Sequence, residues 1–326
     1  MPDRIPGRDP SLASGRSRHR LAVALACATV VLLAAGGLVT STGSGLAVPD
    51  WPLSFGRVFP PLVGGVLYEH GHRLVAASVG LLTMIVAVWF LAREGRAWVR
   101  RLALAAAGVV LAQGILGGVT VLLRLPTAVS VAHACLAQGF FCLTVLLGLA
   151  TSPRFSARDP DPLIEPAPPL WAIAGSATAL VYGQLILGAI MRHTGAGLAI
   201  PDVPLAFGRI VPPILSFEIA IHFAHRVGAL VVASLVVWAV GRVLRLHRVR
   251  SDLRRPALLA LALVALQILL GAAAVATRLA VLPATAHVVT GALLLAACLV
   301  LTVRAARARS RRPRALPLPS PAGEAA

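Results

Sequence analysis

The chain has 326 residues, 58% of them hydrophobic, and a mean hydropathy of +0.84, whereas soluble domains are only about 45–50% apolar. The basic residues behind its net charge of +18 are all arginines, and they gather in short segments between apolar runs. They therefore describe membrane topology rather than a nucleic-acid surface. Composition and charge exclude a soluble enzyme and a nucleic-acid-binding protein, and they predict an integral membrane protein in contact with the lipid bilayer.

Eight apolar runs follow one another along the chain, and each is long enough, at about 20 residues, to cross a bilayer as a helix. We expect helices at 21–40, 70–92, 102–123, 128–150, 170–191, 218–242, 257–277 and 284–303. The first run is too long for the apolar core of a signal peptide, so it is interpreted as a span. Residues 1–20 and 304–326 are predicted to be tails, the first of them disordered and basic.

The arginines predict the orientation of these spans. They are concentrated in the two tails, in the 93–101 loop, in the 151–169 linker and in the 242–255 segment, whereas the alternate loops contain only one or two each. Cytoplasmic segments carry the excess of basic residues in membrane proteins. Both termini are therefore predicted to be cytoplasmic, with the protein in the plasma membrane.

An internal repeat divides the chain at the Pro-rich linker 152–169. Residues 42–61 match residues 194–213 at 14 of 20 positions, and His72 and His133 recur as His225 and His287. Each half, 21–151 and 170–303, has four spans, so both halves keep the same orientation. We expect two four-helix bundles related by a pseudo-two-fold axis along the membrane normal.

The repeated histidines predict two metal sites. In each half the two histidines lie near the start of helices that begin on the outer side of the membrane. His72 lies in the first turn of its helix, and His133 lies about 8 Å along its own helix, so the two share a depth near the outer surface. Neutral imidazoles at one depth on facing helices can bind both axial positions of a haem iron. A hydrogen-bonded core histidine is the ordinary alternative, and zinc is less suited because it favours four ligands in one cluster. The predicted pairs are His72 with His133, and His225 with His287.

Glu69 makes the two predicted sites unequal. It lies three residues before His72, on the same helical face, and its counterpart in the repeat is His222. A carboxylate beside one pair predicts a substrate site in the first half and an electron-transfer haem in the second. The alternative is that Glu69 caps its helix or interacts with the positive end of the helix dipole.

Further polar residues flank the histidines. Arg73 and Arg226 follow the ligands directly and are candidates for contacts with haem propionates, although they can also snorkel to the outer interface. His222 shares a face with His225 and is a candidate for orienting that ring or a propionate. The loops 41–68 and 193–217 are predicted to cover the haem sites as lids, with Asp50 and Asp202 holding turns within them.

These residues give the chain a resemblance to the haem A synthase family, over nearly all of residues 21–303. The motifs that carry it are the Thr-Gly-Ser-Gly-Leu…Pro-Asp-Trp-Pro loop at 42–52, its second copy at 194–204, Glu69-x-x-His72-Arg73, Ala132-His133, His225-Arg226 and Ala286-His287. The resemblance implies oxidation of the C8 methyl group of haem O to the formyl group of haem A, for terminal oxidases, with oxygen from water.

The resemblance also assigns roles. It implies haem O as substrate between His72 and His133, haem b as cofactor between His225 and His287, and Glu69 as the catalytic acid. Haem O synthase, the protohaem farnesyltransferase, and oxidase assembly factors are the expected partners.

The chain departs from the family in two places. It has no cysteine pairs in the outer loops, since its four cysteines all lie inside apolar runs, and Thr40 stands where many members carry arginine, which Arg192 keeps in the second half. Two other functions remain open at this point: a di-haem b-type electron-transfer cytochrome, which would not need Glu69, and a haem or quinone transporter.

Overall fold

A computed structural model describes residues 10–156, 163 and 165–309 of the chain. Within these residues the regular structure is helical, apart from two isolated β-bridges. The helices are α1 Pro10–Ser41, α2 Gly65–Arg93, α3 Ala97–Leu122, α4 Thr127–Thr151, α5 Pro153–Ser156, α6 Leu170–His193, the short 3-10 helix η1 Ala196–Leu198, α7 Phe217–Leu246, α8 Ser251–Ala276 and α9 Val281–Arg309. Eight of them are long and apolar enough to cross a membrane, which confirms the predicted all-α, multi-pass class.

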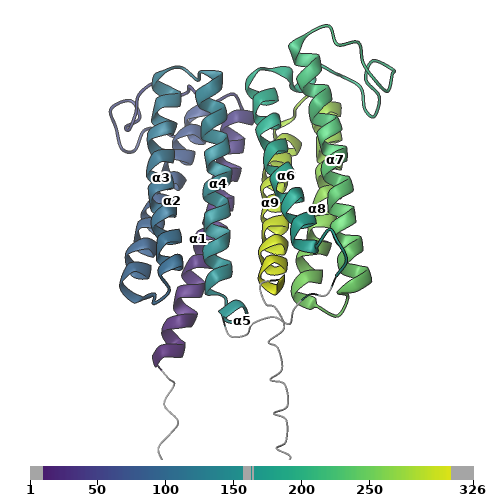
Figure 1. Ribbon diagram of the computed structural model, residues 1–326. Helices are drawn as coiled ribbons and strands as arrows, with labels where there is room; N and C mark the ends of the chain where they lie inside the picture. Colours follow the sequence, from purple (N-terminus) through teal and green to yellow (C-terminus); the bar gives the residue numbers. More distant parts are fainter. Residues whose placement is uncertain (1–9, 157–162, 164, 310–326) are drawn as a thin grey trace, which may run out of the picture.

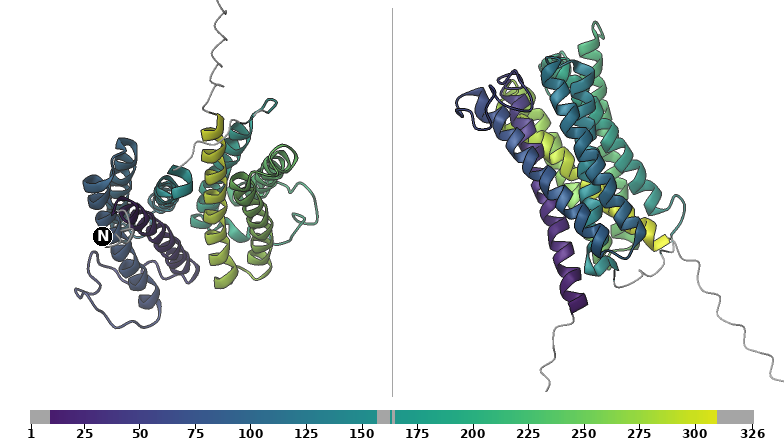
Figure 2. Two further views of the ribbon diagram at one scale, coloured as in Figure 1. Left: turned by 90° about the horizontal axis from the view of Figure 1, so that it is seen from below. Right: turned by 90° about the vertical axis from the view of Figure 1, so that its left-hand side faces the viewer.

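The helices lie in two groups, with α1 to α4 on one side and α6 to α9 on the other (Figure 1). Matching neighbours are in contact in both groups: α1 with α2 and α4, and α6 with α7 and α9. The groups meet where α1 and α4 pack against α9 and where α4 packs against α6, and the view from below shows them side by side (Figure 2). This is the arrangement that two copies of a four-helix unit would give.

Both long loops lie at one end of the molecule, and the described chain begins and ends at the other (Figure 1). The loops connect α1 to α2 and η1 to α7. The arginine-rich connections at 93–101 and 242–255 lie at the end opposite the loops, as the charge pattern predicted. The histidines, near the first residues of α2, α4, α7 and α9, therefore lie at the loop end.

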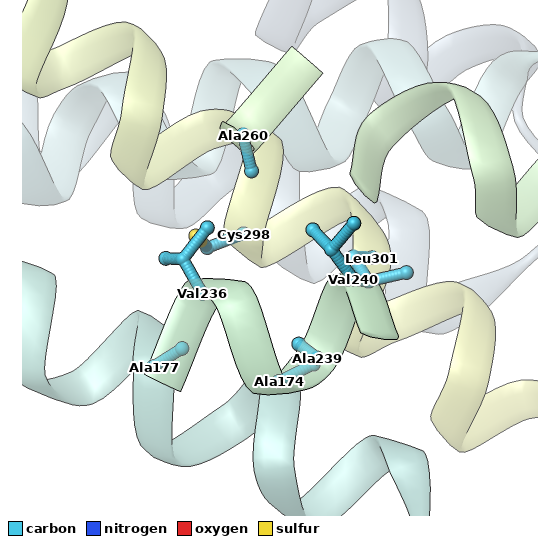
Figure 3. A pocket seen from close by; sticks show the side chains of 8 residues that line it. All are labelled: Ala174, Ala177, Val236, Ala239, Val240, Ala260, Cys298 and Leu301. Carbon is cyan, nitrogen blue, oxygen red and sulfur yellow. The ribbon is translucent and has the colours of Figure 1, made fainter. Parts of the chain in front are cut away.

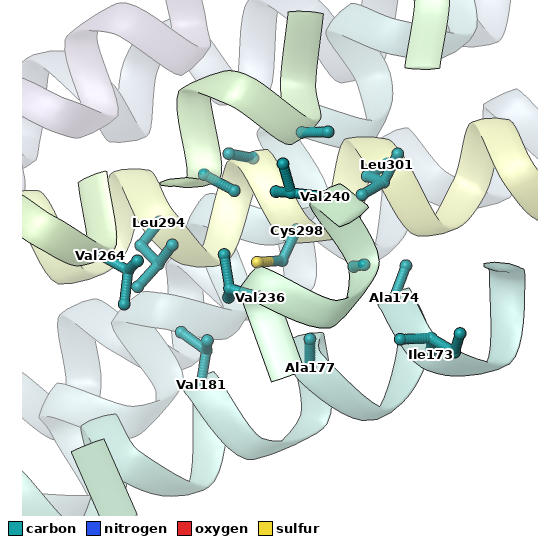
Figure 4. Packing of buried hydrophobic residues seen from close by; sticks show 14 of the residues in the cluster. Ile173, Ala174, Ala177, Val181, Val236, Val240, Val264, Leu294, Cys298 and Leu301 are labelled. Carbon is teal, nitrogen blue, oxygen red and sulfur yellow. The ribbon is translucent and has the colours of Figure 1, made fainter. Parts of the chain in front are cut away.

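The cores between the helices consist of small and branched apolar side chains. In the second half, Val236 and Val240 of α7 pack against Leu294 and Cys298 of α9 (Figure 4). Alanines let these helices approach closely, and they leave only a small apolar void between α6, α7, α8 and α9, next to Cys298 (Figure 3). This void is entirely apolar and lies apart from the histidines, so it offers no chemistry.

The helix boundaries correct two predictions. α1 begins at Pro10 and not at residue 21, so residues 10–20 are helical and only residues 1–9 of the predicted tail lie outside the described residues. α2 begins at Gly65, so His72 is its eighth residue and lies two turns in, not in the first turn. Apolar runs mark only the membrane-crossing part of a helix, and arginine is a good helix former that lets the helix continue beyond that part.

α9 likewise continues to Arg309, past the predicted end at residue 303. The rest of the predicted C-terminal tail, 310–326, and most of the linker 152–169 lie outside the described residues. The extended end of α1 has a partner, because Arg18 donates to the carboxylate of Glu94 at 3.1 Å. This contact ties α1 to the connection between α2 and α3 at the end opposite the long loops.

Candidate functional site

Each of the four repeated histidines rests on a glycine of the neighbouring helix. A methyl group built on that glycine would lie against Cε1 of the imidazole. The distances are 3.2 Å for Gly36 and His72, 3.1 Å for Gly117 and His133, 3.0 Å for Gly188 and His225, and 3.1 Å for Gly271 and His287. The rings therefore pack directly on helix backbone, which restricts their orientation.

The two histidines of the second half lie next to each other. The ring centroids of His225 and His287 lie 6.4 Å apart, with the ring planes inclined by 63°. Two imidazoles that bind one metal ion from opposite sides, each through a nitrogen at about 2 Å, place their centroids roughly 6 Å apart. The second pair therefore fits a bis-imidazole site. His72 and His133 are close enough to interact electrostatically, and iron binding at either pair stays a prediction.

The rings of the two pairs are held differently at Nδ1. In the second half, Nδ1 of His287 lies 3.1 Å from the backbone oxygen of Gln267, and Nδ1 of His225 lies 3.0 Å from the side-chain Nε2 of Gln184. In the first half, the buried Nδ1 atoms of His72 and His133 have no hydrogen-bond partner within the described residues. Within the described residues, the rings of the second pair thus have partners at Nδ1 and those of the first pair do not, and Nε2 of His287 also lies 3.4 Å from the amide nitrogen of Gln267.

Glu69 is 4% exposed, and both oxygens of its carboxylate are hydrogen-bonded. Oε1 accepts from Nη2 of Arg73 at 2.6 Å, and Oε2 accepts from the backbone N–H of Val48 at 2.8 Å. Glu69 therefore does not cap its own helix, and it ties the outer loop to α2. Each carboxylate oxygen keeps a further lone pair beyond these bonds, so a water molecule can still donate to it.

His222 occupies the equivalent place in the second half. Its Nδ1 accepts from the backbone N–H of Ile200, the counterpart of Val48, at 3.3 Å. The same loop-to-helix contact is thus made by a carboxylate in one half and an imidazole in the other. His222 also interacts with the backbone of Ala196, and its predicted role in orienting His225 stays a prediction.

Arg73 and Arg226 both reach back to loop carbonyl groups. Arg73 donates to the carbonyl oxygens of Asp50 and Leu53, each at 2.8 Å. Arg226 donates to those of Leu205 at 2.9 Å and Ile200 at 3.0 Å. Their observed role is to hold the loops on α2 and α7, and the predicted propionate contacts stay a prediction.

The aspartates hold turns, as predicted. Asp50 accepts from the backbone N–H groups of Phe55 and Gly56, each at 2.8 Å, and Asp202 binds the corresponding pair in the second loop. These N–H groups, Gly56 first, hold the pKa of the Asp50 carboxyl below its ordinary value. Phe55 has a φ of 52°, a left-handed conformation that these hydrogen bonds support.

The first loop covers its site with an aromatic ring. The indole of Trp51 lies over Gly118, where a methyl group would come within 2.6 Å of it. Gly118 is the neighbour of Gly117, the glycine that contacts His133. Trp51 therefore lies close to His133, as expected for a loop that covers this site. Val203 takes the place of Trp51 in the second half, with Ala272 in place of Gly118.

A second polar contact fastens the first loop. Nδ1 of the buried His70 lies 2.8 Å from Oγ of Ser54. The side chain is therefore directed at the loop. The second half replaces this pair by Phe223 and Ala206, so the polar contact is exchanged as a unit for an apolar one.

The two halves meet next to the sites. Arg192, at the end of α6, donates to Oγ of Ser41 at 2.8 Å, and Ser41 in turn contacts Oγ1 of Thr285 at 2.9 Å. Thr40, which stands where the first half lacks an arginine, instead donates to the carbonyl of Gly36 in its own helix at 3.1 Å. The arginine of this position thus joins the second half to the first.

The sequence analysis missed three residues that contact the histidines: Gly36, which packs against His72, and Gly188 and Gln184, which contact His225. The repeat held a signal for the two glycines, because they align with each other at the same offset as the loops, 152 residues. Gln184 had no such signal, since Leu32 is its counterpart. The partner of a side chain across a helix pair cannot be read from helices that are apolar nearly all round.

Comparisons with known proteins confirm the family resemblance. A family model described as COX15-CtaA, cytochrome oxidase assembly protein, matches residues 63–299, which include all four repeated histidines. The haem A synthase of Symbiobacterium thermophilum is 36% identical over 269 residues, which cover 77% of this chain and 84% of that protein. Those of Shouchella clausii and Geobacillus kaustophilus are 31% and 30% identical, with 68% and 83% of this chain covered and 75% and 86% of the relatives.

Proposed function

The chain belongs to the COX15-CtaA family of cytochrome oxidase assembly proteins, and we propose that its two halves divide the work of a haem A synthase between them. Its activity is that of an oxidoreductase within a multi-pass membrane protein. The first half binds the substrate haem O between His72 and His133. The second half binds haem b between His225 and His287, where the ring geometry suits a metal bound from both sides.

The reaction converts the C8 methyl group of haem O to a formyl group in two successive oxidations. Each oxidation removes two electrons and two protons, and water supplies the oxygen atom. When bound, haem b supplies a one-electron carrier beside the substrate half. What the chain itself must provide is a fixed substrate, a base for the protons of water and a site from which bulk water is excluded.

Glu69 is the residue proposed to take the proton from water. The observation that carries this role is its position: a buried carboxylate, fixed by Arg73 and the N–H of Val48, on the ligand helix of the first half only. A general base must lie within hydrogen-bond reach of the proton that it abstracts. Because its two observed bonds fix the carboxylate without using all its lone pairs, a water between Glu69 and the substrate can be oriented and deprotonated.

Trp51 and the loop that carries it are proposed to close the substrate half. The indole lies close to His133, and the loop is held on α2 by Glu69, His70 and Arg73. A closed site strengthens electrostatic interactions within it and prevents side reactions with bulk water.

The membrane orientation and the partners belong to the same proposal. The arginine-rich connections lie at the end opposite the loops, which supports cytoplasmic termini and haem sites near the outer face of the plasma membrane. Haem O synthase is proposed to deliver the substrate, and oxidase assembly factors to receive the product, because haem O and haem A are both poorly soluble in water.

The test is the replacement Glu69→Gln in the purified protein supplied with haem O. Glutamine keeps an acceptor for the N–H of Val48 but is not a base, so haem A formation should be lost while the haem content stays that of the wild type. Haem extraction measures both. Gly80→Ala is the matched control, because it lies on the same helix and a methyl group there meets nothing within 4 Å, so it should retain the activity.

The outcomes separate the remaining functions. Haem A formation by the Glu69→Gln variant would exclude Glu69 as the base. Haem b as the only bound haem, even with haem O supplied, would favour the electron-transfer cytochrome. Uptake and release of unmodified haem O would favour the transporter.

A further inference from the structure

Gln184 on α6 holds the edge of His225 on α7 through a single amide nitrogen. Its Nε2 lies 3.0 Å from Nδ1 of the ring and donates to the backbone carbonyl of His225 at 2.6 Å. One side chain thus restrains both the imidazole and the helix turn that carries it. A metal-binding histidine depends on such a partner, because the group at the second ring nitrogen sets the tautomer and the orientation of the ring.

The space for this amide comes from Gly228, three residues after His225. A methyl group at Gly228 would overlap Oε1 of Gln184, so any larger residue there would push the amide away from the ring. A glutamine amide offers a donor at one end and an acceptor at the other. In the observed pose the amide N–H groups donate, so Nδ1 is the bare nitrogen of the ring. When Nε2 binds a metal, the proton lies on Nδ1, and the amide must then turn Oε1 toward the ring and give up its bond to the His225 carbonyl.

The first half lacks both residues. Leu32 aligns with Gln184 at an offset of 152 residues, and Val75 aligns with Gly228 at 153. Neither side chain can form a hydrogen bond, and the buried Nδ1 of His72 has no partner in the described part of the chain. The exchange of a glutamine and a glycine for two apolar residues thus removes the anchor completely.

The second ligand of each half repeats this difference. Nδ1 of His287 lies 3.1 Å from the backbone oxygen of Gln267, and a methyl group at Gly291 would come within 3.0 Å of the Gln267 amide. The first half has Ala137 in place of Gly291. There the counterpart of Gln267 donates only to the backbone carbonyl of His133, at 2.9 Å, and leaves the ring unanchored.

On the basis of the proposed function, we propose that Gln184, seated by Gly228, is the positioning residue by which the second half retains haem b, and that Leu32 and Val75 leave the first half open to exchange of haem O for haem A. A resident cofactor requires slow dissociation. A substrate site must release its product after each turnover, and an unanchored imidazole can swing away from the metal at lower cost.

The test measures haem release from the purified, haem-loaded protein to excess apomyoglobin, followed by absorbance. Gln184→Leu places the first-half residue in the second half and should speed release of haem b about 10–100-fold, as loss of a partner behind a metal ligand does. Gly228→Ala should act in the same way by displacing the amide. Because both act through one contact, the double variant should release haem no faster than Gln184→Leu alone.

Gly183→Ala is the matched control, since a methyl group there meets nothing within 4 Å. Its release rate should equal that of the wild type. The midpoint potential of haem b provides a second readout, because it should shift in Gln184→Leu and Gly228→Ala but not in the control, whereas a merely structural weakening of the bundle would leave it in place.

The reverse exchange, Leu32→Gln with Val75→Gly, should slow release of haem O from the first half. Release of haem b at the wild-type rate by Gln184→Leu would overturn the proposal. If Gln184→Leu does not fold, the reverse exchange decides: slower release of haem O supports the anchor, and an unchanged rate overturns it. All these rates are measured whether or not haem A is formed, so this proposal and the proposed function fail separately.

Discussion

The two halves of this protein share the parts that position a ligand and differ in the parts that surround it. Both have a pair of histidines seated on glycines, an aspartate that closes a loop turn and an arginine that holds the loop. The first half adds Glu69 and Trp51, whereas the second half has His222 and Val203 there and adds Gln184. Duplication thus preserved the arrangement of the histidines while their surroundings diverged, and the proposed function assigns reaction to one half and retention of a cofactor to the other.

The strongest test of this comparison removes one ligand at a time. His225→Ala should abolish binding of haem b and, because electrons then have no carrier, haem A formation as well. His72→Ala should lose the substrate haem and leave haem b in place. Pyridine haemochrome spectra of the purified variants give the amount and type of each haem. Loss of both haems from either variant would mean that the halves do not bind independently.

Replacing the glycines that contact the histidines should have a smaller effect, in the same direction in both halves. Gly36→Ala and Gly188→Ala each place a methyl group 3.0–3.2 Å from an imidazole, which should tilt the ring and weaken haem binding in the corresponding half. Visible spectra and haem content measure this loss.

Gly80→Ala is the control for these variants, because nothing lies within 4 Å of its methyl position. It should instead stabilise its helix by about 1 kcal/mol, the usual gain from glycine to alanine. Thermal unfolding in detergent should show a raised melting temperature for Gly80→Ala and no such rise for the variants at Gly36 and Gly188. Variants at Gly36 and Gly188 that bind haem like the control would show that the glycines serve only helix packing.

The smallest effect concerns the fastening of the loops. Ser54→Ala leaves Nδ1 of His70 without its observed partner and should destabilise the first half by about 1–3 kcal/mol. Adding His70→Phe reproduces the apolar pair of the second half, Phe223 with Ala206, and should recover most of this loss. A double-mutant cycle from thermal unfolding measures the coupling. Additive effects would contradict a direct contact.

The sequence predicted most of the fold because apolar length, arginine distribution and the repeat each reported a different property of it. The repeat also singled out the four histidines proposed as ligands, since only these four of the nine histidines recur at matching positions. The extension of α1 and α2 was missed because a helix does not end where its apolar residues end. The roles of Arg73 and Gln184 were missed because they depend on which carbonyl or ring nitrogen lies across a helix pair, and no periodicity encodes that.

Gly36, which contacts His72, is followed by a glycine that contacts the other half of the molecule. A methyl group at Gly37 would lie 3.2 Å from Cγ2 of Thr285 on α9. Thr285 precedes His287 by two residues. Two successive backbone units of α1 thus touch the ligand of one centre and the ligand helix of the other. If the two pairs hold haem as proposed, an electron would have a continuous packed route between them through the backbone of α1, with no lipid to cross.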